Sequence, residues 1–288
     1  MVKKLGVTEI TETEKSKMAA PTKFENFLKI LQNEALLLDW MAWVMIATSF
    51  IVIILLLFVS APYGRYTATG NKYLTLLKVP VKVAWFLQEL PSFTVPLGLV
   101  IFTESTQFKN LSNKILITMF LLHYSQRALL FPFLIRGGKP TPFLPFFLAF
   151  VFCAYNGYMQ GRMLTQFQVY SDTYFTDLNV CIGVAMFIMG MSINLHSDHV
   201  LRNLRAPGET GYKIPRGGMF EYVSGANFFG EILEWSGFAL ACLNLQAAAF
   251  ALFTFCNLVP RAYSHHQWYL QKFEDYPKQR KAVIPYIL

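Results

Sequence analysis

The sequence predicts an all-α, polytopic membrane protein, built as a bundle of seven transmembrane helices. Of its 288 residues, 54% are hydrophobic and only 15% are charged, a composition that a soluble domain with a charged surface does not have. Apolar segments long enough to cross a bilayer, which takes roughly 20 residues, recur along the chain. Lys and Arg gather in alternate connections between these segments, as in membrane proteins that follow the positive-inside rule.

Seven segments have the length and polarity of a membrane span. In order, they are residues 36–60, 80–103, 114–135, 142–166, 178–196, 222–243 and 247–263. The last two are close enough together to form one helical hairpin. Residues 1–35 form a polar tail without the apolar core of a signal peptide. We therefore expect the first span to act as its own anchor, and residues 36–288 to form one membrane domain.

The basic residues predict an orientation, because short cytosolic loops carry the excess of positive charge. With the N-terminal tail in the lumen, the lumenal loops hold only Lys109, Lys114 and Arg162. We therefore expect a cytosolic C-terminus. The cytosolic loop 197–221 and the tail from about residue 264 are rich in groups that bind anions. A basic, aromatic surface helix resting on anionic lipid headgroups is an equally good interpretation of that tail.

Two spans carry polar side chains that a purely structural helix would avoid. Gln88 and Glu89 lie within the stretch "WFLQELPSF" of the second span, and His123, Tyr124 and Arg127 lie within the third. His123 and Arg127 are four residues apart, so they share a helix face. An ionisable side chain at membrane depth is a candidate functional site.

The sixth span carries a polar face of its own. Asn227, Glu231 and Glu234 recur at i, i+4 and i+7, which places them on one side of a helix. A bundle interior lined in this way is either a proton or ion path or a pocket for a polar ligand. The structural alternative is that Glu89 and Glu231 pair with basic side chains such as Arg127 and only hold helices together.

Several motifs that would indicate another chemistry are missing from the sequence. GxGxxG and GxxxxGK[ST] are absent, which argues against a Rossmann fold and a P-loop. HExxH, GxSxG and the Cys/His spacings of zinc sites are absent as well. We expect neither a metal nor a nucleic-acid partner. The four cysteines are interpreted as small apolar packing residues: Cys153, Cys181, Cys242 and Cys256.

Long stretches of the chain resemble a known family. They read "WFLQELPS", "HYSQRALLFPFLIRGGKPTP", "NGYMQGR", "INLHSDHVLRNLRAPGETGYKIPRGGMFEYVSGANFFGEILEW" and "RAYSHHQWYLQKFEDYPKQRKAVIP". These stretches resemble the steroid 5α-reductase family from about residue 63 to the C-terminus, and "RGGKP" and "GYKIPRGG" favour the vertebrate type 1 isozyme over type 2. The resemblance implies a seven-helix enzyme of the endoplasmic reticulum membrane. It would use NADPH to reduce the carbon 4–5 double bond of 3-oxo-Δ4 steroids such as testosterone, progesterone and androstenedione.

The resemblance also implies roles for individual residues. Glu89 and Tyr124 match the pair that holds the steroid 3-ketone, and Trp85 and Gln88 are expected to bind substrate beside them. The resemblance also implies a cofactor-binding half at about residues 136–288. The implied NADPH-binding positions are Tyr63, which precedes that half, and Lys139, Asn194, Asp198, Arg205, Tyr212, Asn227, Glu231, Arg261, His265 and Tyr269 within it. Lys139 stands where type 2 has an arginine. A phosphate contact there would therefore be made by the point charge of an ammonium group and not by a bidentate guanidinium.

The implied chemistry agrees with the polar residues in the spans. Conjugate addition of hydride to an enone puts negative charge on the ketone oxygen, which calls for a hydrogen-bond donor in a dry site. Glu89 could be neutral and donate directly, or be ionised and orient the Tyr124 hydroxyl. Carbon 4 would take its proton from water or from Tyr124. We expect the steroid to enter from the lipid, with membrane lipids as the other partners.

Two other functions stay open at this point. A related NADPH-dependent reductase could act on the double bond of a polyprenol or of trans-2-enoyl-CoA, although the elements "QELPS" and "HY" favour a steroid. A transporter or structural membrane protein with ion pairs bridging its helices would instead leave NADPH absorbance unchanged with any enone.

Overall fold

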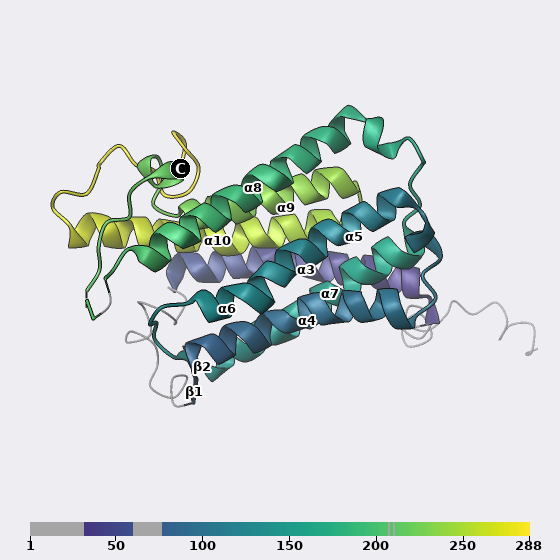
Figure 1. Cartoon of the computed structure of the whole chain (residues 1–288), viewed down its shortest axis with the longest axis horizontal. Helices are drawn as coiled ribbons and strands as arrows, with labels where there is room; N and C mark the ends of the chain where they lie inside the picture. The colour runs from purple at the N-terminus through teal and green to yellow at the C-terminus, as the bar shows by residue number, and fades with distance from the viewer. Residues whose placement is uncertain (1–31, 60–76, 207, 210) are drawn as a thin grey trace, which may run out of the picture. The chain divides into compact units, whose positions relative to one another are not determined.

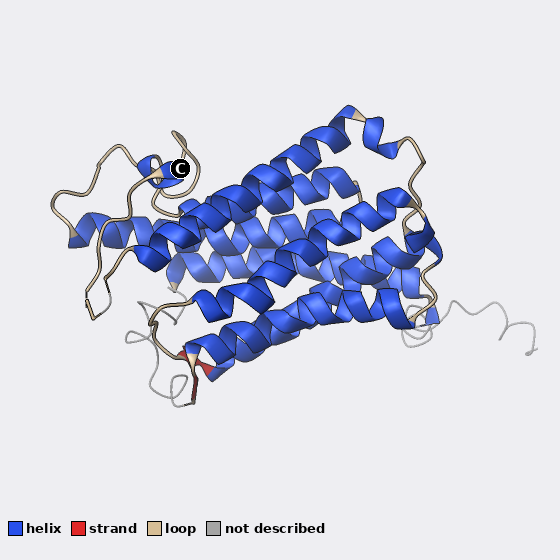
Figure 2. Cartoon of the chain, in the orientation of Figure 1, coloured by secondary structure: helices blue, strands red, loops and turns tan. Residues whose placement is uncertain are grey.

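The computed structural model describes residues 32–59, 77–206, 208–209 and 211–288. The chain divides into two compact units, Met1–Leu37 and Leu38–Leu288. The second unit is built almost entirely of helices, and the only strands among its described residues are the short antiparallel pair β1 (Lys78–Val79) and β2 (Thr141–Pro142) (Figure 2). The predicted all-α, polytopic membrane class is confirmed. Tyr63, a predicted cofactor position, lies outside the described residues.

The long helices follow one another along the chain and lie side by side in Figure 1. They are α3 (Glu34–Phe58), α4 (Val81–Phe102), α5 (Leu111–Tyr124), α7 (Phe143–Arg162), α8 (Leu178–Asn203), α9 (Ala226–Cys242) and α10 (Leu245–Lys272). The π-helical turn η3 (Ser125–Leu130) joins α5 to the short α6 (Phe131–Leu134), and a second one, η4 (Met163–Phe167), ends α7. The described part of the chain also contains three short 3-10 turns: η2 (Thr106–Lys109), η5 (Tyr174–Thr176) and η6 (Gly218–Glu221).

Six helical segments of the described chain are long and apolar enough to cross a membrane. They are Glu34–Phe58, Val81–Phe102, Leu111–Leu134, Phe143–Phe167, Leu178–Asn203 and Leu245–Lys272. The remaining predicted span, 222–243, corresponds to α9, which has 17 residues and carries two carboxylates. By length and composition, the structure therefore supports six of the seven predicted spans.

Two helices continue well past the ends that the apolar pattern predicts. The span predicted to end at residue 196 continues to Asn203, and the one predicted to end at 263 continues to Lys272. Hydropathy finds where the apolar surface ends, whereas the backbone hydrogen bonds of a helix continue through polar residues. As a result, part of the predicted cytosolic loop and tail is helical.

Glycines allow α8 and α9 to pack with their backbones in direct contact. Gly183 and Gly190 on α8 and Gly230 and Gly237 on α9 are each seven residues apart, so each pair lies along one face. A Cβ atom at Gly230 would come within 2.6 Å of the Asn194 backbone nitrogen. Small residues at membrane-helix interfaces permit this close approach. It holds the polar face of α9 against α8.

A side chain at Gly190 should therefore destabilise the protein. Its Cβ would overlap the backbone of Glu234, which cannot turn away as a flexible side chain could. We expect Gly190→Ala to lower the free energy of unfolding by about 1–3 kcal/mol through overpacking, measured as a lower Tm in detergent. Gly98→Ala on α4 is the matched control, because its nearest neighbour would be the Phe102 ring at 4.0 Å. Equal Tm values for the two variants would contradict this account of the α8–α9 contact.

The C-terminal segment docks onto the connection between α8 and α9. The backbone nitrogens of Ser224 and Gly225 donate to the carbonyl oxygens of Lys281 and Ala282 at 2.9 Å. Arg280 is buried and donates to the Pro215 carbonyl oxygen at 2.9 Å. The segment after α10 is thus joined to the residues that begin α9, at the polar end of the site described next.

The buried Arg280 also contacts a carboxylate of η6. Its guanidinium lies 3.2 Å from Glu221 Oε2. A hydrogen bond from the Gly217 backbone nitrogen, followed by the charge of Arg280, lowers the pKa of Glu221. The carboxylate is therefore favoured in its ionised form, which complements the buried cation.

Candidate active site

A cavity of about 610 Å³ lies among the helices of the second unit, and every long helix contributes to its wall. Its volume is within the range of small-molecule sites, roughly 300–1,000 Å³. The wall contributed by α3 and α7 is mainly apolar, with Val52, Leu55, Leu148 and Phe152 among its residues. Polar residues of α8, α9 and α10 form another part of the wall. The cavity can therefore hold a ligand with one apolar and one polar part.

Glu89 faces this cavity from α4, together with Trp85 and Gln88. Gln88 Nε2 lies 3.5 Å from Glu89 Oε1, and Cys153 Sγ lies 3.6 Å from Glu89 Oε2. Cys153 was interpreted from the sequence as a packing residue, but the structure has it on the cavity wall. Hydropathy counts a thiol as apolar and does not report which side of its helix faces a cavity. Glu89 therefore has two weak donors beside it and an open side toward the cavity.

Tyr124, the last residue of α5, lines the same cavity and is buried. Its ring packs against Phe120 at a centroid distance of 4.8 Å, His123 at 4.9 Å and Trp235 at 5.8 Å. Within the described part of the chain, no hydrogen bond joins Tyr124 to Glu89. Aromatic packing thus fixes the phenol, while the phenol and the carboxyl group are both available to a third group in the cavity.

The helix widens immediately after Tyr124, in the π-helical turn η3. Single π-helical turns inside helices occur frequently at functional sites. The turn contains Arg127, which is buried and lines the cavity together with Tyr124. Tyr124 and Arg127, three positions apart, thus face the same cavity.

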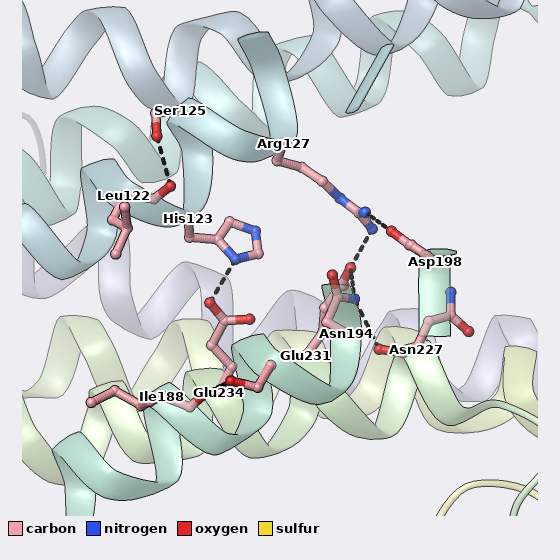
Figure 3. Close-up of polar contacts among 11 residues, drawn as sticks. Leu122, His123, Ser125, Arg127, Ile188, Asn194, Asp198, Asn227, Glu231 and Glu234 are labelled. Carbon is pink, nitrogen blue, oxygen red and sulfur yellow. Dashed lines mark hydrogen bonds and ion pairs between the residues drawn. The ribbon is translucent and has the colours of Figure 1, made fainter. Parts of the chain in front are cut away.

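Arg127 joins α5 to α8 and α9 through two carboxylates (Figure 3). Its Nη1 donates to Asp198 Oδ2 at 2.7 Å, and its Nη2 donates to Glu231 Oε1. The guanidinium also lies 5.1 Å from the Trp85 ring centroid and 4.6 Å from that of Phe131. The ion pair that the sequence suggested for Glu231 is thus present. Glu89 is not part of this ion pair, because Arg127 contacts Asp198 and Glu231 instead.

Asn194 extends this cluster without lining the cavity. Its amide nitrogen donates to Glu231 Oε1 at 3.2 Å and to the Asn227 carbonyl oxygen at 3.1 Å (Figure 3). Three predicted cofactor positions on two helices are therefore in direct contact. Asn227, Glu231 and Asp198 lie on the cavity wall.

A second buried pair lies one helical turn away from Arg127. His123 Nδ1 is 2.7 Å from Glu234 Oε1, and Glu234 is completely buried (Figure 3). His123 lines the cavity, whereas Glu234 supports it from behind. The sequence indicated both as polar residues of spans but gave neither a role. Their sequence positions are 111 residues apart, and spacing within one helix carries no signal for such a contact.

Another part of the cavity wall is a polar stripe on α10. Arg261 and His265, both predicted, line the cavity there, and so do Asn257 and Ser264. The Arg261 guanidinium lies 5.0 Å from the Phe228 ring centroid. Asn257 and Ser264 are not among the predicted positions. Positions 257, 261, 264 and 265 follow helical spacing, so the same periodicity test that found the face of α9 would have found them.

Besides Asn194, four predicted cofactor positions of the described chain do not line the cavity. They are Lys139, Arg205, Tyr212 and Tyr269. Arg205 Nη1 donates to the Gly211 carbonyl oxygen at 3.2 Å on the exposed connection after α8. Tyr269 is buried and stacks on Tyr276 with ring centroids 5.2 Å apart. Lys139 is exposed. A role of these four residues in cofactor binding stays a prediction.

Comparison with known proteins shows the family of the chain. The family model described as 3-oxo-5-alpha-steroid 4-dehydrogenase matches residues 139–288. The chain is 53% identical over 258 residues to 3-oxo-5-alpha-steroid 4-dehydrogenase 1 of Bos taurus, covering 88% of this chain and 98% of the relative. It is 54% identical over 256 residues to the protein of the same name from Mus musculus, covering 89% and 99%.

The type 2 proteins are less similar. The chain is 47% identical over 235 residues to 3-oxo-5-alpha-steroid 4-dehydrogenase 2 of Homo sapiens, covering 81% of this chain and 91% of the relative. The predicted resemblance to the type 1 isozyme is confirmed. With relatives above half identity over nearly their whole length, the chain belongs to the 3-oxo-5-alpha-steroid 4-dehydrogenase family of oxidoreductases.

Proposed function

We propose that the protein reduces the carbon 4–5 double bond of 3-oxo-Δ4 steroids, such as testosterone, progesterone and androstenedione, to 5α-dihydrosteroids with NADPH. One observation carries the proposal: a single cavity is lined by Glu89, by Tyr124 and by the polar stripe of α10. Its apolar lining from α3 and α7 suits a steroid skeleton, which offers few polar groups to a protein.

In this reaction, Glu89 and Tyr124 polarise the substrate ketone. Negative charge grows on the ketone oxygen when carbon 5 receives hydride, and donors that are already in place stabilise that charge most in a site without water. The Tyr124 hydroxyl donates to the oxygen, while Glu89 either donates as a neutral acid or orients the phenol. Gln88 and Cys153 hold the carboxyl group from its other side.

The polar wall has the donors that NADPH requires. Arg261 and His265 can contact its anionic groups, and the side chains of Asn227, Asn257 and Ser264 can bind hydroxyl and amide groups. The carboxylates of Asp198 and Glu231 are already paired with Arg127, which limits their repulsion of a phosphate. When bound, NADPH supplies the hydride. In this proposal, the exposed cations Arg205 and Lys139 bind its phosphates from outside the cavity.

The proposal includes seven membrane crossings: the six helical segments that are long and apolar enough, and α9 in addition. At about 1.5 Å per residue, its 17 residues extend about 26 Å, close to the roughly 30 Å of a hydrocarbon core. The proposal also has the C-terminus in the cytosol and the N-terminal tail in the lumen of the endoplasmic reticulum, an orientation that the distribution of basic residues supports. The contact of Thr106 in η2 with Gln166 in η4 joins the two predicted lumenal loops at one end of the bundle. The steroid would enter from the lipid.

Turnover by the purified protein tests this function directly. We expect NADPH oxidation with a panel of 3-oxo-Δ4 steroids, and a product with 5α stereochemistry by NMR. A polyprenol and a trans-2-enoyl-CoA serve as competing substrates. Turnover of either one without turnover of any steroid would replace the proposed substrate, and no NADPH oxidation with any enone would favour a transporter or a structural protein.

A further inference from the structure

We propose that His123, oriented by Glu234, donates the proton that carbon 4 of the steroid receives. This inference rests on the proposed function. Reduction of the double bond adds a hydride at carbon 5 and a proton at carbon 4, and Glu89 and Tyr124 account only for the ketone oxygen. A proton donor for carbon 4 therefore has to come from another part of the cavity.

The pair of His123 and Glu234 holds a proton at the cavity wall. Glu234 has no exposed surface, and its Oε2 atom has no hydrogen-bond partner among the described residues. An ionised carboxylate at such depth is costly unless a cation pairs with it. Its partner within reach is the His123 imidazole at 2.7 Å. The carboxyl group and the imidazole therefore form one hydrogen-bonded acid pair, in which Nδ1 is engaged and Nε2 is the ring nitrogen left to transfer a proton.

The second nitrogen of the ring is available to a ligand. Only Nδ1 of His123 is engaged, by Glu234, within the described chain. Figure 3 shows the other ring nitrogen directed away from Glu234, on the side of Arg127. The ring is held in place by edge contacts with Tyr124 and with Trp235, whose centroid lies 4.6 Å away. Nε2 is therefore a donor of fixed direction on a residue that lines the cavity.

His123 is also in the right place along the substrate. Carbon 4 is bonded directly to the carbonyl carbon, whose oxygen is held by Tyr124 and Glu89 in the proposed reaction. His123 precedes Tyr124 in the chain, and the two rings are in contact at 4.9 Å. A donor adjacent to the phenol on the same wall can reach the carbon adjacent to the carbonyl.

The other ionisable groups that face His123 already have partners or roles. Arg127 of η3 is bound to Asp198 of α8 and to Glu231 of α9. Glu89 of α4 and Tyr124 of α5 contact the ketone oxygen in the proposed reaction. Of the carboxylates on α9, Glu234 is the one that contacts the imidazole. The proton at Nε2 therefore has no competing acceptor within this group of residues.

The step balances in atoms and electrons. Hydride forms the new bond to carbon 5 with its own electron pair, and the electrons of the double bond shift through carbon 4 to the ketone oxygen. Carbon 4 then uses that electron pair to take the proton from His123 Nε2, and the carbonyl group re-forms. The N–H electrons stay on the ring, which remains bonded to Glu234 through its Nδ1 hydrogen. Water entering the cavity between turnovers returns the proton.

The wild-type protein alone can test this proposal. Reduction of testosterone with NADPH in D2O should place deuterium at carbon 4 on one face only, because a donor of fixed direction delivers it. The product is analysed by NMR. A mixture of both carbon 4 isomers from the wild-type protein would overturn the proposal, since it would mean that an enol leaves the site and takes its proton from bulk water. Deuterium stereochemistry at carbon 4 does not bear on reduction itself, so the proposed function would survive that result.

Variants then separate a proton donor from a structural residue. His123→Gln should lower kcat by roughly 10²-fold, the low end for general acid catalysis, with KM little changed and with both carbon 4 isomers formed. Glu234→Gln should give a smaller loss, because its amide oxygen still orients the ring. His199→Gln, on the exposed face of α8, is the matched histidine control. NADPH binding by protein fluorescence checks that each variant is folded.

Two outcomes with His123→Gln would count against the role. One is a wild-type kcat, and the other is a lower kcat with deuterium still on a single face of carbon 4. Should this variant not bind NADPH, Glu234→Gln and the wild-type stereochemistry decide the question. Failure of the wild-type protein to reduce any steroid would instead reject the proposed function.

Discussion

A Glu89→Gln, Tyr124→Phe double variant is expected to lose at least about 10³-fold in kcat for steroid reduction, since removal of one donor to a developing oxyanion costs roughly 10²–10³-fold. Both side chains line the cavity, and no hydrogen bond joins them within the described chain. The phenol donates to the ketone oxygen, and the carboxyl group donates or orients. Single-turnover measurements of NADPH oxidation isolate the chemical step.

The two single variants indicate how the groups share this task. Residues that act as a unit have non-additive effects, so we expect each single variant to lose nearly as much activity as the double one. Thr94→Val is the control, because Thr94 is exposed on the same helix α4 and only bonds its own backbone. Retention of full activity by the double variant would refute the assignment of both residues.

Replacement of Arg127 by Met is expected to have the largest effect on stability. It leaves the buried Asp198 and the partly buried Glu231 without their shared cation. Removing one partner of a buried ion pair typically costs about 3–5 kcal/mol. We expect a large decrease in Tm in detergent, together with loss of steroid reduction. Arg127→Lys should be intermediate, because an ammonium group cannot reproduce the two-sided geometry of the guanidinium.

A charge-compensated variant identifies the cause. Combining Arg127→Met with Asp198→Asn and Glu231→Gln removes the unpaired charges, so it should recover part of the lost stability without recovering activity. Arg136→Met is the matched control: this arginine is exposed and contacts Asn203 at the end of α8. A Tm of Arg127→Met equal to that of Arg136→Met would show that the buried cluster does not stabilise the bundle.

The arrangement of the polar residues is a property of the assembled helices. Asn227, Glu231 and Glu234 share one face of α9, as their spacing predicts, yet they serve different neighbours. Glu231 contacts Arg127, which lies 104 residues earlier in the chain, whereas Glu234 contacts His123. A periodicity of 3.6 residues specifies a face and not the residue opposite it.

For Glu89, too, the sequence indicated a functional residue but not the residues that it contacts. Its stretch in the second span already indicated a functional carboxyl group, because a charge at that depth requires a reason. The sequence offered Arg127 as a structural partner. In the structure, Arg127 contacts Asp198 and Glu231, while Glu89 has Cys153 beside it, a residue that hydropathy had classed with the core.

The sequence alone therefore determined the helical membrane class, the approximate spans, the polar faces and the family, because each depends on local composition, local periodicity or long colinear matches. Only the tertiary structure decided where α8 and α10 end, which carboxylate pairs with which base, and which residues line one cavity. Those features depend on contacts between helices that are far apart in the chain. The close backbone packing of α8 against α9 is one such contact, and the polarity of the residues does not reveal which helix lies opposite.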